Sequence, residues 1–459
     1  MTALLRVAIV GGGWAGMAAG VRAVQAGHQP TVFEVARTLG GRARTMRAPL
    51  ANGTQVTLDN GQHIMIGAYS ETLALMKLVG VDEDKALLRL PLTLVFPDGK
   101  GITLPRLPAP LDAVVGILNA QGWDARDKLT LLRTAAGWQW HAFRCNAAAT
   151  VAQLCRPLTP RVMAELIEPL CVSALNIPAA RASGQVFLRV IRDSLFAASR
   201  GSNLLLPRTD LSAMFPLPAA DWLQARGASV LTGERVEALH RISSGWLIND
   251  KAFDAVILAC PSWEAARLVE GAAVGLQTDS GKQMTGWVHR CKSLAFEAIT
   301  TVYATSKTRL DHPMLSLRAT PAHPAQFVFD RGQLGGPTGL LAFVISASSG
   351  ERDDLQDRVM AQGRLLGFKD LEPLQTVVEK RATFACTPGL LRPTVEVAPG
   401  LLACGDYVEG PYPATIEGAV RSAAQAVAQL AVMPDLIRHP PRREDVLSQG
   451  AMDPGSSPG

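Results

Sequence analysis

The sequence predicts an α/β fold in which a doubly wound domain, assembled from separated segments, carries an inserted mixed α+β domain. Three observations lead to this prediction. Residues 5–10 form a short apolar run that ends in glycines, as a buried parallel strand does, and residues 14–27 continue as a helix. A strand–loop–helix pattern returns at residues 400–432. Between them, residues 70–200 have mainly helical patterns, and residues 294–347 contain β-branched runs typical of a sheet.

Composition narrows the class of protein. The chain has 459 residues, of which 48% are hydrophobic, more than one small core requires. Its net charge of +5 is scattered, without the basic stripe of a nucleic-acid-binding protein, so no nucleic-acid partner is predicted. No two of the seven cysteines have CxxC spacing, which indicates free thiols in a reducing cytoplasm and no metal site.

The N-terminal residues show no targeting segment. The sequence MTALLRVAIVGGG leads directly into the first strand and lacks the apolar region and cleavage site of a signal peptide. No apolar stretch reaches the ~18 residues that a spanning helix needs. We therefore expect a cytoplasmic protein that is soluble or attached to a membrane surface.

A nucleotide-binding fingerprint joins the first strand to the first helix. Gly11 permits the tight turn, Gly13 lets the backbone approach a pyrophosphate, and Gly16 allows close packing of helix and strand. The N-terminus of the helix offers free N–H groups to the phosphates. The complete GxGxxG sequence consists of Gly11, Gly12, Gly13, Trp14, Ala15 and Gly16.

Glu34 ends the second predicted strand, about 20 residues further on, where a carboxylate accepts hydrogen bonds from ribose hydroxyls. An acidic residue here disfavours the 2′-phosphate of NADP. The glycine pattern alone specifies only a dinucleotide.

The next loop favours FAD. After Glu34 come Arg37 and then Gly40-Gly41-Arg42. This E-x5-GGR spacing resembles the flavin-containing amine oxidase and phytoene desaturase superfamily, in which the loop runs under the pyrophosphate and flavin. Two glycines let the backbone close on a cofactor, and an arginine balances phosphate charge.

A second pair of elements near the C-terminus carries the same resemblance. Gly405-Asp406 follows a strand, and Thr415 and Ile416 begin a helix with the sequence Ile-Glu-Gly-Ala. In the superfamily the aspartate binds a ribityl or phosphate oxygen, and the helix N-terminus points at the flavin pyrimidine, where its dipole favours the reduced anion. The resemblance also places the backbone of Val236 against adenine.

The resemblance implies a Rossmann-like FAD-binding domain of the GR2 type. It extends over nearly all of residues 5–432. The implied FAD-binding domain comprises residues 1–70, 203–290 and 385–432, the substrate domain comprises residues 71–202 and 291–384, and residues 433–459, rich in Pro, Arg, Gly and Ser, are expected to be a disordered tail.

Five further segments resemble the hydroxysqualene dehydroxylases, also called squalene-associated FAD-dependent desaturases. This resemblance implies reduction of hydroxysqualene to squalene in bacterial hopanoid biosynthesis, with hydride passing from reduced FAD to an allylic cation. The substrate would be a long apolar polyprenyl chain. Ala423 departs from the glycine of many relatives, which puts only local helix packing in doubt. The segments are residues 59–69 (DNGQHIMIGAY), 171–176 (CVSALN), 201–210 (GSNLLLPRTD), 327–331 (FVFDR) and 410–415 (GPYPAT).

Three residues are candidates for catalysis. Loss of hydroxide from an allylic alcohol requires a proton donor, and His63 follows the loop that passes the reactive edge of the flavin in the superfamily. Gln62 could orient the substrate oxygen, and Tyr412 could do the same or line the pocket. Alternatively, His63 bonds to backbone, Asp59 fixes the loop, and the flavin with apolar walls stabilises the cation without a protein acid.

The helical insert predicts either an apolar tunnel or an ordinary core. Aromatic residues at helical spacing are more often core than ligand-binding. The residues concerned are Trp123, Trp138, Trp140 and Phe143.

Other functions stay open. A carotenoid or phytoene desaturase is the nearest rival because it also handles a long polyene with FAD. An amine oxidase usually has an aromatic residue where this chain has Thr415, and an FAD-binding escort protein often lacks part of the flavin site.

The partners that the sequence predicts are an electron source and a membrane surface. Without a second dinucleotide fingerprint, the electron source is either a partner reductase or free NAD(P)H. A membrane-soluble substrate favours peripheral contact with the inner membrane face, although no amphipathic anchor is evident.

Overall fold

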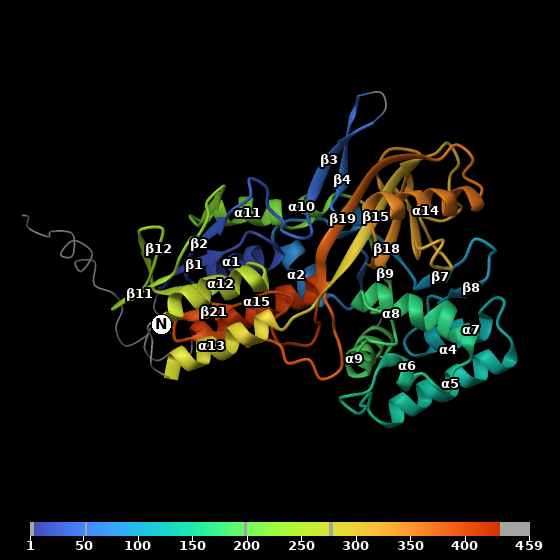
Figure 1. Ribbon diagram of the computed structural model, residues 1–459, viewed down its shortest axis with the longest axis horizontal. Helices are drawn as coiled ribbons and strands as arrows, with labels where there is room; N and C mark the ends of the chain where they lie inside the picture. The colour runs from blue at the N-terminus through green and yellow to red at the C-terminus, as the bar shows by residue number, and fades with distance from the viewer. Residues whose placement is uncertain (1–3, 51–52, 197–199, 275–278, 432–459) are drawn as a thin grey trace, which may run out of the picture.

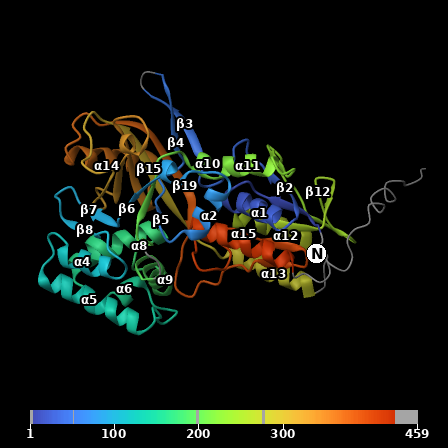
Figure 2. The ribbon, with the colours of Figure 1, turned by 180° about the vertical axis from the view of Figure 1, so that it is seen from behind.

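The computed structural model describes residues 4–50, 53–196, 200–274 and 279–431. The predicted tail, residues 433–459, lies outside the described residues. The chain has the predicted α/β fold, with the nucleotide-binding domain at one end of the molecule and the inserted domain at the other (Figure 1 and, from behind, Figure 2).

The nucleotide-binding domain is built on a six-stranded sheet with the order β10-β2-β1-β14-β21-β20. All neighbours are parallel except β20 and β21. Strands buried on both faces read as continuous apolar runs, as in Ala255–Leu258. The strands are β1 (Arg6–Val10), β2 (Gln29–Glu34), β10 (Ser229–Thr232), β14 (Ala255–Leu258), β20 (Glu396–Ala398) and β21 (Leu401–Ala403).

Helix α1 lies at the centre of this domain and packs against α11 and α15, while a three-stranded sheet packs against β1 and β14. These elements are α1 (Trp14–Gln25), α10 (Leu211–Met214), α11 (Pro216–Gln224), α12 (Ser262–Ala273), α13 (Asp279–Lys292), α15 (Ile416–Leu430), β11 (His240–Ile242), β12 (Gly245–Ile248) and β13 (Lys251–Phe253).

The inserted domain contains a five-stranded antiparallel sheet with the order β16-β17-β18-β15-β19. One face packs on helix α14 and the other on a helical lobe, so each face has its own apolar core. The elements are β15 (Phe296–Thr305), β16 (Met314–Ser316), β17 (Phe327–Asp330), η2 (Arg331–Leu334), β18 (Leu340–Ser348), α14 (Arg352–Leu365) and β19 (Glu372–Phe384).

The helical lobe forms the end of the molecule away from the nucleotide-binding domain, below the sheet in Figure 1. It contains α4 (Leu111–Asn119), α5 (Ala125–Trp140), α6 (Val151–Leu154), α7 (Pro160–Val162), the π-helix η1 (Met163–Ile167), α8 (Glu168–Leu175) and α9 (Gly184–Leu195).

Short elements connect the two domains. They are β3 (Thr45–Pro49), β4 (Gln55–Asp59), β5 (Met65–Ile66), α2 (Ser70–Leu78), α3 (Glu83–Ala86), β6 (Leu87–Leu90), β7 (Thr93–Val95), β8 (Gly101–Thr103) and β9 (Leu204–Pro207).

The first domain boundary differs from the expected position at residue 70. Leu75, Met76, Ala86 and Leu87 are buried in the core of the nucleotide-binding domain, although the substrate domain was expected to begin at residue 71. The reason is that α2 packs against α15, a helix more than 330 residues later, which local patterns do not reveal.

Candidate active site

A cavity of about 590 Å³ lies where the carboxyl ends of β1 and β2 meet the loops after β14 and β21. Such an edge of a doubly wound sheet is where nucleotides bind. Fourteen of the residues predicted for the site line it: Gly11, Gly13, Trp14, Ala15, Glu34, Gly40, Gly41, Arg42, His63, Val236, Gly405, Asp406, Thr415 and Ile416.

The three fingerprint glycines meet different constraints. Gly11 has φ +117°, and a Cβ there would lie 2.7 Å from the Ala259 carbonyl oxygen. A Cβ on Gly16 would lie 1.8 Å from the Gly11 carbonyl oxygen, so the turn requires glycine there for its own packing. A Cβ on Gly13 would meet no protein atom nearer than 3.8 Å, so the space beside Gly13 is available to a ligand.

The N-terminus of α1 opens onto this space. No side chain of the described residues caps it at Gly13, and its first turn contains no acidic residue. Its free N–H groups and positive dipole end therefore suit a pyrophosphate. Tyr407 also lines the cavity, and its buried hydroxyl has no hydrogen-bond partner in the part of the chain that the structure describes.

Glu34 is fixed by the fingerprint turn. One carboxylate oxygen accepts a hydrogen bond from the Gly12 N–H at 2.6 Å, and the other accepts from the Ala36 N–H at 2.8 Å. Each oxygen keeps a further lone pair, so Glu34 can still accept a ribose hydroxyl.

Arg42 joins three distant segments beside the cavity. Its guanidinium pairs with the buried Asp406 carboxylate and donates to the Ala382 carbonyl oxygen at 2.8 Å. Arg44, which the sequence reasoning missed, also lines the cavity and donates to the Gly41 carbonyl oxygen at 2.6 Å. Arg37, by contrast, is exposed and does not line the cavity.

The C-terminal elements are held by local hydrogen bonds. Thr415 caps α15 by accepting from the Gly418 N–H at 3.0 Å. Glu417 is fully buried and accepts from the N–H groups of Glu71 and Thr72, which begin α2. The glutamate of the Ile-Glu-Gly-Ala sequence thus fastens α15 to α2.

His63 lies in the cavity and is oriented by backbone. Its Nδ1 is 2.9 Å from the Gly61 carbonyl oxygen, which leaves Nε2 as the ring nitrogen free for a ligand. Burial lowers the pKa of His63 below its ordinary value, and Arg42 lowers it further. The neutral imidazole is therefore the main form at neutral pH, which makes His63 a weaker proton donor than expected.

Gln62 does not lie where the sequence prediction placed it. Its amide oxygen accepts from buried Arg331 at 3.3 Å, its amide nitrogen donates to the His63 carbonyl oxygen, and it does not line the cavity. The prediction that Gln62 orients a substrate oxygen is therefore wrong, because its amide is bonded to Arg331 and His63 outside the cavity. Neither the DNGQH sequence nor its spacing indicates Arg331 as a partner.

Tyr412 also lies outside the cavity. It lines a second, smaller pocket of about 90 Å³ and donates its hydroxyl to Asp193 at 2.8 Å. This agrees with the pocket-lining alternative rather than with a hydroxyl poised at the flavin.

Asp59 fixes the loop, as the alternative interpretation expected. It accepts from the Leu211 N–H at 2.8 Å at the start of α10. Burial raises the pKa of Asp59 to about 6.

The second pocket adjoins the first. Both are lined by Ile64, Tyr69, Thr415 and the residues 173–175. The walls of the second pocket are mainly apolar, and its aliphatic and aromatic lining residues are Ile64, Ile66, Leu92, Leu94, Leu170, Leu175, Phe187, Val190, Ile191, Leu195, Leu204, Met314 and Phe327.

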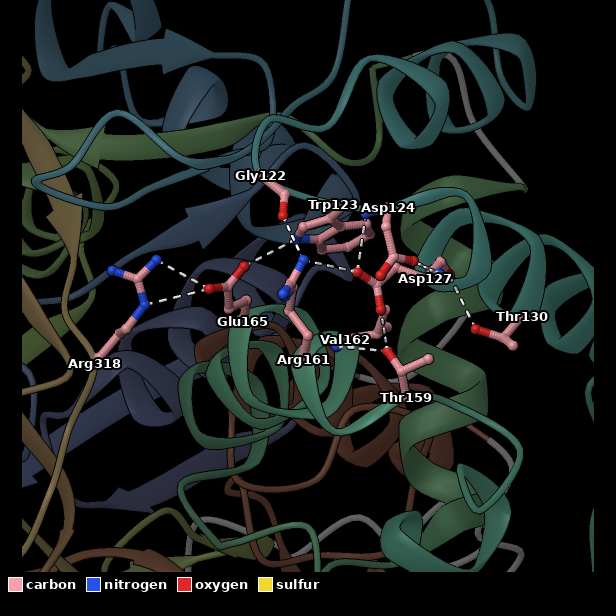
Figure 3. A network of polar contacts seen from close by, with 10 residues as sticks. All are labelled: Gly122, Trp123, Asp124, Asp127, Thr130, Thr159, Arg161, Val162, Glu165 and Arg318. Atoms are coloured by element: carbon pink, nitrogen blue, oxygen red, sulfur yellow. Dashed lines mark hydrogen bonds and ion pairs between the residues drawn. The ribbon is translucent and has the colours of Figure 1, made fainter.

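The aromatic residues of the helical insert form core rather than a tunnel. Trp123, Trp138 and Phe143 are buried in the lobe, and none lines either pocket. Trp123 donates to Glu165 at 2.9 Å, and Glu165 also pairs with Arg318 beside the sheet (Figure 3). Trp140 is 87% exposed.

The described residues contain neither a cluster that could bind a metal nor a helix that could span a membrane. No group of three or more His, Cys, Asp or Glu side chains among them could hold a metal ion. None of the helices they form is long and apolar enough to cross a membrane.

Comparison with known proteins places the chain among flavoenzymes. A family model for flavin-containing amine oxidoreductases matches residues 14–431. The hydroxysqualene dehydroxylase of Rhodopseudomonas palustris is 27% identical over 92% of this chain and 97% of its own length, and that of Zymomonas mobilis is 25% identical over 92% and 98%. The zeta-carotene desaturase of Synechocystis is 30% identical, but over only 27% of this chain and 25% of its own.

Solved structures share the fold. An oxidoreductase from Methanosarcina mazei superposes with a TM-score of 0.68 at 16% identity and covers 93% of this chain and all of its own.

The glycine geometry predicts different effects for two substitutions. Gly16→Ala should prevent normal folding or lower the thermal midpoint strongly, because its Cβ would overlap a backbone oxygen. Gly13→Ala should leave the apoprotein thermal midpoint within about 2 °C of the parent and weaken FAD binding at least about tenfold. Thermal unfolding and FAD titration check both. Equal FAD affinity in Gly13→Ala and the parent would contradict the assigned path of the pyrophosphate.

The raised pKa of Asp59 predicts that the free energy of unfolding depends on pH. Its pKa of about 6 in the fold lies above the ordinary 3.8, so its contribution to stability is present at low pH and is lost as pH rises through 6. Asp59→Asn keeps the acceptor for Leu211 without the charge. We expect the variant to gain on the order of 3 kcal/mol relative to the parent between pH 4 and pH 7. Denaturant unfolding across this range measures the difference, and parallel pH profiles would disprove it.

Proposed function

The chain belongs to the flavin-containing amine oxidoreductase family, and we propose that it acts within this family as a hydroxysqualene dehydroxylase. Family membership confirms the predicted FAD cofactor and the predicted oxidoreductase class. The resemblance to hydroxysqualene dehydroxylases is confirmed over most of the chain. The proposed reaction is the reductive dehydroxylation of hydroxysqualene to squalene in hopanoid biosynthesis.

The observation that carries this proposal is the composition of the second pocket. Each of the five segments on which the resemblance rests contributes to its wall: Ile64, Ser173, Ser202, Phe327 and Tyr412 come from five separate stretches of the chain. The five segments that carry the resemblance thus converge on an apolar pocket beside the cofactor cavity. The apolar character of these walls matches that of a polyprenyl chain, because burial of apolar surface drives binding.

The proposed chemistry requires loss of oxygen and gain of hydride at one allylic carbon. The C–O bond breaks, the oxygen takes up a proton and leaves as water, and a C–H bond forms at the carbon. When bound, reduced FAD supplies the hydride. Apolar walls such as Leu175 exclude bulk water, which would otherwise capture an allylic cation.

His63 is the proposed proton donor. Of the three catalytic candidates, it alone lines the larger cavity, with Nδ1 engaged by Gly61 and Nε2 left for substrate. Only its protonated form can donate from Nε2 while Nδ1 bonds to Gly61.

Two alternative functions differ in substrate. A carotenoid or phytoene-type desaturase would also use an apolar pocket, but the desaturases named among the relatives match only 17–28% of this chain. An amine oxidase usually has an aromatic side chain in place of Thr415, whose hydroxyl instead caps α15.

The reaction can be tested with reduced protein under anaerobic conditions. Incubation of the FAD-loaded chain, reduced chemically, with hydroxysqualene should yield squalene and oxidised flavin in equal amounts. The measurement is extraction with mass spectrometry, alongside the flavin absorbance near ~450 nm. Phytoene and an aliphatic amine, each offered to oxidised protein, serve as comparisons. Desaturation of phytoene without formation of squalene would overturn the proposal.

The role of His63 predicts a pH profile. Because burial lowers its pKa, kcat/KM should increase as pH falls through a value below 6.5. His63→Ala should lose at least about 100-fold in turnover and lose this pH dependence while FAD stays bound. Tyr412→Phe is the matched control, because it removes a hydroxyl already bonded to Asp193 and should keep turnover within a few-fold. Turnover of His63→Ala within a few-fold of the parent would exclude the role as acid.

A further inference from the structure

Helix α4 presents apolar side chains to solvent. Leu111, Val114 and Leu118 are 56%, 38% and 51% exposed. Their spacing of three and four residues places them on one face of the helix. The opposite face buries the small residue Gly116 against Leu104, together with the carboxylate-bearing Asp112. Ala113 and Ile117 are buried as well, so α4 is apolar on both faces, whereas a surface helix of a soluble domain normally has a polar exposed face.

The neighbouring helix α5 extends this surface. Leu129 and Trp140 are 51% and 87% exposed, and Arg126 and Arg133 are exposed as well. The four positions recur at helical spacing and share the solvent-facing side of α5. Helices α4 and α5 pack together at the end of the molecule away from the nucleotide-binding domain (Figure 1).

The charge around these helices is positive. Residues 101–164 contain seven Lys or Arg and three Asp or Glu, a net charge of +4 in a chain whose total is +5. Asp112 and Asp127 are buried, so Asp124 is the one exposed acidic residue within this stretch of the described chain. The apolar face is thus accompanied by exposed cations without matching exposed anions.

We propose that this face docks on the surface of an anionic lipid bilayer. Apolar side chains flanked by basic ones, with an exposed tryptophan, are what an interfacial helix requires, because the apolar groups enter the acyl boundary and the cations meet anionic headgroups. The docking face consists of Leu107, Leu111, Val114, Leu118, Leu129 and Trp140, with Arg126 and Arg133.

Charge favours a bilayer over a second copy of the chain. A two-fold dimer through this face would bring the positively charged faces of both copies together, and like charges at an interface oppose association. An anionic membrane neutralises them instead.

The docking face connects to the apolar pocket. Asp112, in the first turn of α4, accepts from the Ser202 hydroxyl at 3.4 Å, and Ser202 lines the second pocket. Docking through α4 would therefore hold the second pocket, the proposed substrate site, near the bilayer in which a lipid-soluble substrate resides. This consequence rests on the proposed function, whereas docking itself rests only on the surface residues.

Vesicle flotation with the full-length, FAD-loaded protein tests the proposal. We expect binding to phosphatidylcholine vesicles that contain phosphatidylglycerol and weaker binding to phosphatidylcholine alone. Leu111→Gln/Val114→Gln/Leu118→Gln should reduce the partition coefficient at least about tenfold on vesicles of both compositions. Arg126→Gln/Arg133→Gln should reduce it about fivefold per arginine, and only on anionic vesicles.

A matched control uses exposed apolar residues elsewhere. Leu365→Gln/Leu391→Gln removes two side chains that are more exposed than those of α4 and should leave binding unchanged. Flavin absorbance and thermal midpoints verify that each variant is folded.

Equal loss of vesicle binding in the control and α4 variants would overturn the proposal. So would absence of vesicle binding by the parent together with a dimer, seen by sedimentation velocity, that the α4 variant converts to monomer. Vesicle binding without squalene formation would contradict the proposed function and leave docking supported.

Discussion

Arg42 is the side chain on which the assembly of the site depends. It lies in the loop after β2, yet its guanidinium bonds to Asp406, which follows β21, and to the backbone of Ala382 in β19. One partly buried cation, paired with a buried carboxylate, therefore connects the two ends of the nucleotide-binding domain with the sheet of the inserted domain. Because removing one partner leaves an uncompensated buried charge, this pairing strongly favours the one arrangement of domains in which the cavity exists.

The two pockets recognise their ligands through different kinds of interaction. In the larger one, backbone groups at Gly13 and the start of α15 present N–H donors, so it recognises a cofactor largely through peptide geometry and helix dipoles. In the smaller one, aliphatic and aromatic side chains offer little beyond shape and apolar surface. Thr415 and residues 173–175 line both, so a substrate held in one is placed directly against a cofactor held in the other.

Much of the cofactor site could be predicted from sequence because its chemistry is local. The turn through Gly11 and Gly16 and the cap at Thr415 each depend on residues a few positions apart. Arg42 was recognisable as a cation for the loop, but its partner was not, because Asp406 lies 364 residues away.

Side-chain direction and surface exposure could not be predicted in the same way. Gln62 and His63 are adjacent, yet one turns toward Arg331 and the other into the cavity, a choice made by packing between domains. The apolar face of α4 was also missed. Its sequence, LDAVVGILN, is apolar nearly all round, so only the packing of Gly116 on Leu104 reveals which side is left outside.

The sheet order has a consequence for synthesis on the ribosome. Strand β21 pairs with β14, and α15 covers α1, but both are the last described elements to be translated. Until they emerge, the nascent chain carries an open strand edge and a bare apolar helix face through the translation of more than 100 residues, which include the sheet of the inserted domain. The cofactor cavity is therefore complete only once residues 405–419, which form one of its walls, have been synthesised.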